Sequence, residues 1–203
     1  MEGVILLNKT VLITKSSQGL GPNLAQSLVN KGCNVIIHYN HNKEQANDLV
    51  KKLGNKQAIA VHADPSKTRD ITILVKLATK HFGQIDAMVN NDLSPVTSTN
   101  QSLHTLDNLT QQLLPQFIKQ KEGAIISLHQ TPAKETEQKL VTDFTQDYAH
   151  NYKEKCIRLN SITSSIPQEK LLNSTPTQHD LTNIISYLVS DSSKEITGKI
   201  ITL

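Results

Sequence analysis

The segment 14–21, Thr-Lys-Ser-Ser-Gln-Gly-Leu-Gly, lies between a short apolar run and a stretch with helical spacing. A glycine-containing turn between a strand and a helix lets the backbone approach a pyrophosphate, whose charge the helix N-terminus stabilises. Two glycines alone are weak evidence, so the interpretation depends on the elements on either side. In that setting the segment predicts a dinucleotide-binding loop formed by Ser17, Gly19, Leu20 and Gly21.

The hydrophobic pattern predicts the elements that would position this loop. Short apolar runs predict about seven strands, at 10–14, 34–39, 58–62, 85–89, 124–128, 157–162 and 199–203. Helical spacing predicts helices at 22–31, 43–53, 71–82, 103–121, 139–155 and 180–190. This alternation is typical of an α/β fold with a three-layer, doubly wound, Rossmann-like parallel sheet. Ligands of such sheets bind at the carboxyl ends of the strands, near the point where strand order reverses.

Composition limits the classes of partner. The chain has 203 residues, which predicts one domain over 1–203, and its net charge of +3 is not gathered into a basic block. We therefore expect no nucleic-acid partner. No apolar run reaches the ~20 residues of a membrane span, and the first seven residues lack the basic start of a signal peptide, so we expect a cytoplasmic protein without a membrane partner.

Cysteines and histidines do not predict a metal site. Cys33 and Cys156 lack metal-type spacing, which favours two buried thiols in a reducing compartment. His38 and His41 are three residues apart, but no acidic or cysteine partner is near them in the sequence. We expect no metal ligands.

From end to end, the chain resembles the short-chain dehydrogenase/reductase family. Segment 14–21 is similar to the family's Thr-Gly-x-x-x-Gly-x-Gly, and 89–93 (Val-Asn-Asn-Asp-Leu) to its Asn-Asn-Ala-Gly. The ending 190–199 resembles the family's Ser-Asp and Ile-Thr-Gly pattern. Segments 113–118 and 123–126 bring it closest to the 3-oxoacyl-(acyl-carrier-protein) reductases.

The resemblance implies a dinucleotide cofactor whose adenosine half is the better preserved. Asp64 corresponds to the family's aspartate that meets the adenine ring, and Asn90 to the first asparagine after strand four. Segment 39–42, Tyr-Asn-His-Asn, ends strand two without the acidic residue that selects NAD, so Tyr39 and its neighbours would tolerate a 2′-phosphate. These residues favour NADP(H), bound weakly or not at all.

Lys15 stands where the family has its first loop glycine, and it is open to two interpretations. It contributes a cation to an anion site, or it marks a changed turn with reduced dinucleotide affinity, because a side chain is disfavoured at positive φ.

The resemblance also implies that the family's four catalytic positions are empty. Ser102 stands at the asparagine position, Gln130 or His129 at the serine, Lys134 at the tyrosine and Gln138 at the lysine. The Pro-Gly that lies against the nicotinamide in the family is replaced at 164–165 by two serines. The loops that cover the substrate, after strands four and six, are shortened.

Two functions follow as hypotheses. The first is a pseudoenzyme without catalytic residues that acts as a binding, structural or regulatory partner. It would form a homo-oligomer or pair with an active relative, and the helices at 103–121 and 139–155 would form the interface. The alternative is an NADP(H)-dependent oxidoreductase that reduces a carbonyl substrate, such as a 3-oxoacyl thioester, in a rearranged site. It would need Lys134 or His129 as proton donor.

Overall fold

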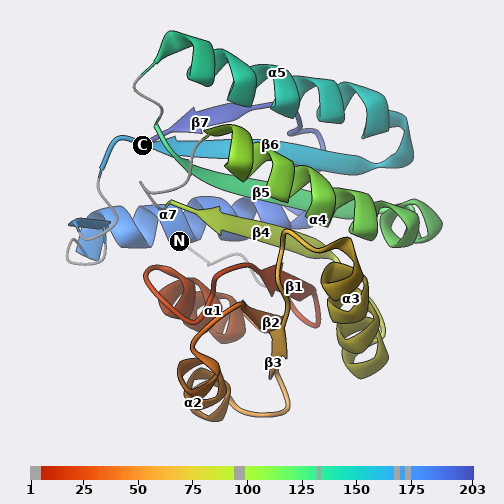
Figure 1. Ribbon diagram of the computed structural model, residues 1–203, viewed down its shortest axis with the longest axis vertical. Coiled ribbons are helices and arrows are strands. Elements are labelled where there is room, and N and C mark those ends of the chain that lie inside the picture. Colours follow the sequence, from red (N-terminus) through yellow and green to blue (C-terminus); the bar gives the residue numbers. More distant parts are fainter. Residues whose placement is uncertain (1–5, 94–98, 132–133, 167–169, 172–174) are drawn as a thin grey trace.

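The computed structural model describes residues 6–93, 99–131, 134–166, 170–171 and 175–203, with only the backbone for 175–179. Seven parallel strands form one sheet in the order β3-β2-β1-β4-β5-β6-β7. They are β1 (Thr10–Ile13), β2 (Asn34–Tyr39), β3 (Ala58–His62), β4 (Ala87–Asp92), β5 (Gly123–Gln130), β6 (Ile157–Ser164) and β7 (Ile200–Thr202). The order reverses between β1 and β4, which confirms the predicted doubly wound sheet (Figure 1).

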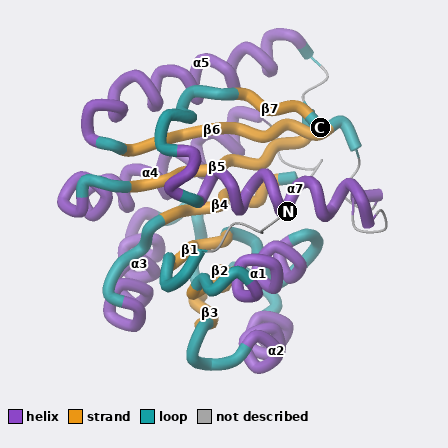
Figure 2. Tube along the Cα trace, turned by 180° about the vertical axis from the view of Figure 1, so that it is seen from behind, coloured by secondary structure: helices purple, strands orange, loops and turns teal. Residues whose placement is uncertain are grey.

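Helices cover both faces of the sheet (Figures 1 and 2). The principal helices are α1 (Gly21–Asn30), α2 (Lys43–Leu53), α3 (Thr68–Phe82), α4 (Thr99–Gln120), α5 (Glu135–Tyr152) and α7 (Thr175–Val189). One apolar cluster joins α1, α2 and α7 to the sheet, and a second joins α3, α4 and α5 to the opposite face. Burial on both faces explains why the strands read as continuous apolar runs instead of alternating patterns. None of the described helices is long and apolar enough to cross a membrane.

The strands that lead to the site continue further than their apolar runs predict. β4 ends at Asp92 instead of Val89, and β5 ends at Gln130 instead of Leu128. Polar residues that we expected in loops therefore pair with neighbouring strands, with Asp92 in register with His129. The loops predicted after β4 and β6 lie partly outside the described residues, at 94–98, 167–169 and 172–174.

The two cysteines lie in different surroundings. Cys33 is buried as expected, but the prediction of a buried Cys156 is wrong, because this residue is exposed. It follows a short 3₁₀ turn, η1 (Lys153–Lys155), and adopts φ +57° where the chain reverses into β6. That reversal at the end of the sheet places its side chain at the surface.

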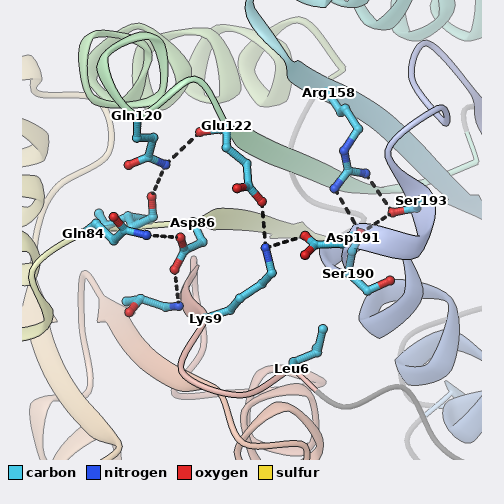
Figure 3. A network of polar contacts seen from close by, with 12 residues as sticks. Leu6, Lys9, Gln84, Asp86, Gln120, Glu122, Arg158, Ser190, Asp191 and Ser193 are labelled. Atoms are coloured by element: carbon cyan, nitrogen blue, oxygen red, sulfur yellow. Dashed lines mark hydrogen bonds and ion pairs between the residues drawn. The ribbon is translucent and has the colours of Figure 1, made fainter.

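Charged groups link the amino ends of the strands (Figure 3). The Lys9 ammonium lies 2.7 Å from Glu122 Oε1 and 2.8 Å from Asp191 Oδ1, and so joins the start of β1 to the start of β5 and to the turn after α7. Asp86 Oδ2 accepts the Thr10 backbone N–H at 2.7 Å, just before β4. Although burial lowers the pKa of Lys9, its bonds to Asp191 and Glu122 raise that pKa above the usual value. These contacts hold the edge opposite the predicted binding site.

Replacing Lys9 by methionine should lower the free energy of unfolding by about 1–2 kcal/mol, because two carboxylates then face each other without a cation. Urea unfolding at pH 7 measures the loss. Lys51→Met is the matched control, since the Lys51–Asp48 pair is exposed on both sides and should contribute nothing measurable. Equal effects of the two substitutions would contradict a special role for Lys9.

Candidate functional site

A cavity of about 380 Å³ opens at the carboxyl ends of β1, β2 and β4, where the strand order reverses. Position and volume are typical of a small-molecule site in a doubly wound sheet. Its lining comes from the turn after β1, the end of β2, the loop after β3 and the end of β4. The lining residues are Lys15, Ser17, Gln18, Gly19, His38, Tyr39, Asn40, His41, Pro65, Asn91 and Leu93.

The turn after β1 approaches α1 closely. A Cβ on Gly21 would lie 2.4 Å from the Ser16 Cα, so only glycine fits at the first residue of the helix. Gly19 adopts φ +56°, a conformation that costs glycine little. Ser16 donates its hydroxyl to the Ile13 carbonyl at 2.8 Å, which closes the turn. The helix N-terminus therefore lies beside the cavity, as an anion site requires.

Lys15 keeps the left-handed backbone of the turn, at φ +47°. Its backbone N–H donates to His38 Nδ1 at 3.2 Å. Because that nitrogen accepts, Nε2 carries the ring proton and donates to the Ala63 carbonyl at 3.0 Å. His38 is buried, and burial lowers the pKa of its imidazole to about 4. The neutral ring thus fixes a strained residue beside the cavity.

The Lys15 side chain forms an ion pair with Asp92 at the end of β4. The lysine side chain is 43% exposed and the aspartate side chain only 4%. A buried carboxylate needs a cation nearby, so Lys15 neutralises Asp92 while its side chain, which lines the cavity, stays partly exposed. Both interpretations of Lys15 stay predictions, because its ammonium is already paired with Asp92.

The predicted cofactor residues fall into two groups. Ser17, Gly19 and Tyr39 line the cavity. Leu20 and Gly21 are buried beneath the turn, and Asp64 bonds to its own loop, accepting from Ser66 and pairing with Lys67 at 3.1 Å.

Asn90 forms hydrogen bonds within the sheet and is not among the residues that line the cavity. Its Oδ1 accepts the Thr14 hydroxyl at 3.0 Å, and its Nδ2 lies 3.5 Å from Ser127 Oγ. The asparagine thereby links β1, β4 and β5.

Asn91 is a lining residue that motif matching did not single out. It is 4% exposed, and its Oδ1 is buried without a hydrogen-bond partner. Leaving a buried oxygen of this kind unsatisfied costs roughly 1–3 kcal/mol. His38 and Pro65 were also missed, because only the fold brings the ends of β2 and β3 to the cavity.

The positions aligned with catalytic residues lie beyond Asp92, around the ends of β5 and β6. His129 is buried between two hydroxyls, with Ser127 Oγ 2.7 Å from Nε2 and Ser102 Oγ 3.4 Å from Nδ1. Burial lowers the pKa of its ring to about 4. Gln130 donates to the Ser164 carbonyl at 2.7 Å.

Lys134 and Gln138 are exposed at the start of α5. Within the described part of the chain, no cluster of three or more His, Cys, Asp or Glu residues could hold a metal ion.

Comparisons with known proteins agree on the family. A family model of the short-chain dehydrogenases matches residues 9–179. A 3-oxoacyl-[acyl-carrier-protein] reductase of Staphylococcus epidermidis is 26% identical over 238 positions, covering 96% of this chain and 97% of the relative. A diacetyl reductase of the same species is 27% identical over 247 positions, covering 95% and 96%. These alignments are longer than the chain's 203 residues, so the relatives carry segments that this chain lacks.

Solved structures share the fold. A hydroxysteroid dehydrogenase from Escherichia coli superposes with a TM-score of 0.82 at 21% identity, covering all of this chain and 96% of the other. The putative 3-oxoacyl-reductase from Bacillus thuringiensis gives the same score at 22% identity, covering 98% and 97%. The chain belongs to the short-chain dehydrogenase family, close to the 3-oxoacyl-(acyl-carrier-protein) reductases, and the predicted resemblance is confirmed.

The two buried histidines make stability depend on pH. In the unfolded chain both rings protonate near pH 6.5, whereas the folded protein holds the pKa of His38 and of His129 at about 4. The unfolded state therefore binds more protons between pH 6.5 and 4, and stability falls as the pH drops through that window. We expect a loss of about 2 kcal/mol per histidine by pH 5.

Urea unfolding at pH 7 and pH 5 measures this loss. His129→Asn should remove its share of the pH dependence, whereas His150→Gln, on the exposed surface of α5, should leave the dependence unchanged. An unfolding free energy that is equal at both pH values would rule out two buried neutral histidines.

Proposed function

We propose that this member of the short-chain dehydrogenase family binds an adenine nucleotide of the NADP(H) type in the cavity beside the turn after β1. The observation that carries the proposal is the lining itself. It combines the turn at Ser17 and Gly19 with the end of β2 and with Asn91 at the end of β4. Tyr39, Asn40 and His41 supply no carboxylate at the end of β2, which supports NADP(H) over NAD(H).

The described residues fit the adenosine part of that cofactor better than its nicotinamide part. Around the ends of β5 and β6, the polar side chains bond to one another: His129 to two serines and Gln130 to the Ser164 carbonyl. NADPH supplies a hydride when bound, but His129 and Gln130 already have partners, and the unpartnered Thr131 hydroxyl after β5 is buried.

Family membership supports an oxidoreductase activity that uses the bound nucleotide. The relatives and solved structures named above are reductases or dehydrogenases by name. Reduction of a carbonyl group, such as that of a 3-oxoacyl thioester, is accordingly the activity to assay first. Lys134 is the better candidate for proton donor, because it is exposed, whereas the buried His129 ring is neutral at pH 7.

A specific observation favours a second candidate, binding without turnover. The positions that align with the family's catalytic residues hold Ser102, Gln130, Lys134 and Gln138. A nucleotide-binding protein of this kind would act as a structural or regulatory partner. Its association would use α4 and α5, which pack side by side on one face of the sheet (Figure 1), either with a second copy or with an active relative.

Calorimetric titration of the purified chain with NADPH and NADH tests the binding proposal. We expect saturable binding of NADPH, at least tenfold tighter than that of NADH, because no carboxylate at the end of β2 repels a 2′-phosphate. If neither nucleotide binds at millimolar concentration, the proposal is wrong.

An assay of NADPH oxidation in the presence of an acetoacetyl thioester distinguishes a rearranged reductase from a protein that binds the nucleotide without turnover. For a rearranged reductase, Lys134→Ala should lower turnover at least a hundredfold, whereas Lys139→Ala, an exposed lysine five residues further along the chain in α5, should leave turnover unchanged. Binding without any oxidation of NADPH above the background would instead support the partner role.

A further inference from the structure

The outward side of α3 combines positive charge with exposed apolar side chains. Five exposed residues recur at intervals of three and four and so share one side of the helix, which we call the α3 face: Arg69, Ile73, Lys76, Leu77 and Lys80. Ile73 is 43% exposed and Leu77 is 48% exposed. The apolar residues that α3 contributes to the core lie on its other side and are buried: Ile71, Leu74 and Ala78.

The cations of the α3 face have no partner among the described residues. Neither an ion pair nor a hydrogen bond engages the side chains of Arg69, Lys76 and Lys80 in that part of the chain. By contrast, the exposed Lys51 and Lys139 each pair with an aspartate on their own helix. The positive charge of the α3 face is therefore left for a partner to neutralise.

Helices α3 and α4 lie side by side (Figure 1), and their carboxylates are engaged away from the α3 face. Asp70 is the only acidic residue of α3, and it accepts the Asp64 backbone N–H at 3.2 Å. Asp107 is the only acidic residue of α4, and it accepts the Tyr148 hydroxyl on α5. Neither carboxylate offsets the charge of the face.

Lys119 extends this positive charge from α3 onto α4. Thr79 donates its hydroxyl to Gln116 Oε1 at 3.2 Å, which joins the carboxyl-terminal halves of the two helices. Lys119 is exposed about one turn beyond Gln116, and no described residue pairs with it. Four cations thus accompany the two apolar side chains.

These features discriminate between kinds of partner. A second copy bound through the same face would bring like charges together. A nucleic acid would meet the cations but leave Ile73 and Leu77 without apolar contacts. Binding in a membrane surface requires an apolar helix face that enters the lipid, whereas α3 buries that face in the core. A protein helix with carboxylates beside apolar residues one turn apart matches both the charge and the apolar pair.

We propose that the α3 face binds an acidic amphipathic helix of a partner protein. Carboxylates of that helix pair with the cations, and its apolar side chains cover Ile73 and Leu77. No residue of the α3 face lines the cavity at the carboxyl ends of the strands. The proposal therefore does not depend on nucleotide binding.

Fluorescence anisotropy with a labelled helical peptide tests the proposal. The probe consists of glutamate and leucine, with the leucines on one side at intervals of three and four residues. We expect saturable binding to the whole chain at low salt. Affinity should fall at least tenfold in Lys76→Gln with Lys80→Gln, which removes charge, and also in Ile73→Ser with Leu77→Ser, which removes apolar contact. Absence of peptide binding, or equal affinity in both variants and the unmodified chain, would overturn the proposal.

Lys52→Gln with Lys56→Gln is the matched control, because it removes two exposed lysines, also four residues apart, at the end of α2 and in the turn that follows. It should leave the affinity unchanged, and far-ultraviolet circular dichroism checks that each variant is folded. A peptide of the same composition with scattered leucines should bind at least tenfold more weakly, and equal binding would overturn the proposal. Tighter binding to phosphatidylglycerol vesicles or to a DNA duplex, lost in Lys76→Gln with Lys80→Gln, would also overturn it.

Discussion

Lys15 holds a left-handed backbone conformation that glycine adopts without strain, and the neighbouring strand provides the bonds that maintain it. A side chain at φ +47° costs about 1 kcal/mol. The His38 ring accepts the Lys15 N–H, and the His38 carbonyl accepts the Ser16 N–H at 3.1 Å. The other ring nitrogen of His38 bonds to the end of β3. The turn, the cavity and the ion pair to Asp92 all depend on this buried neutral imidazole.

The same pairing of polar groups continues across the carboxyl edge of the sheet. Thr14, Asn90 and Ser127 link β1, β4 and β5 through their side chains, and Ser127 passes the connection to His129. Polar groups this deeply buried would destabilise the sheet if they lacked partners. Because they bond to one another, these groups need no cofactor to be stable, whereas Asn91 Oδ1 and, directly after β5, Thr131 Oγ1 are buried without partners.

The doubly wound parallel sheet and its ligand-binding edge could be predicted from the sequence, because alternating apolar runs and helical stretches leave few topologies. The extension of β4 to Asp92 could not, since Asn90, Asn91 and Asp92 are unusual in a buried strand. Their partners come from β1 and β5, which are distant in sequence. For the same reason the roles of His38 and Asp92 were missed, because the ring and the carboxylate contact Lys15 only when the fold brings β2 and β4 next to the turn. Loss of catalysis remains a prediction, and the comparisons favour the oxidoreductase alternative.

Membership of an enzyme family leads us to expect catalysis, whereas the polar groups at the carboxyl edge of the sheet do not. What matters is whether these groups are accessible and able to transfer a proton. A catalytic group must be close to the substrate and able to exchange a proton near neutral pH. Burial holds the pKa of His129 at about 4, and serine hydroxyls face both of its nitrogens. Lys134 is accessible, but it lies at the start of a helix where no described residue fixes its ammonium group. A reductase built on this edge would therefore have to organise its proton donor only when substrate is bound, whereas the cavity proposed for a nucleotide is already formed.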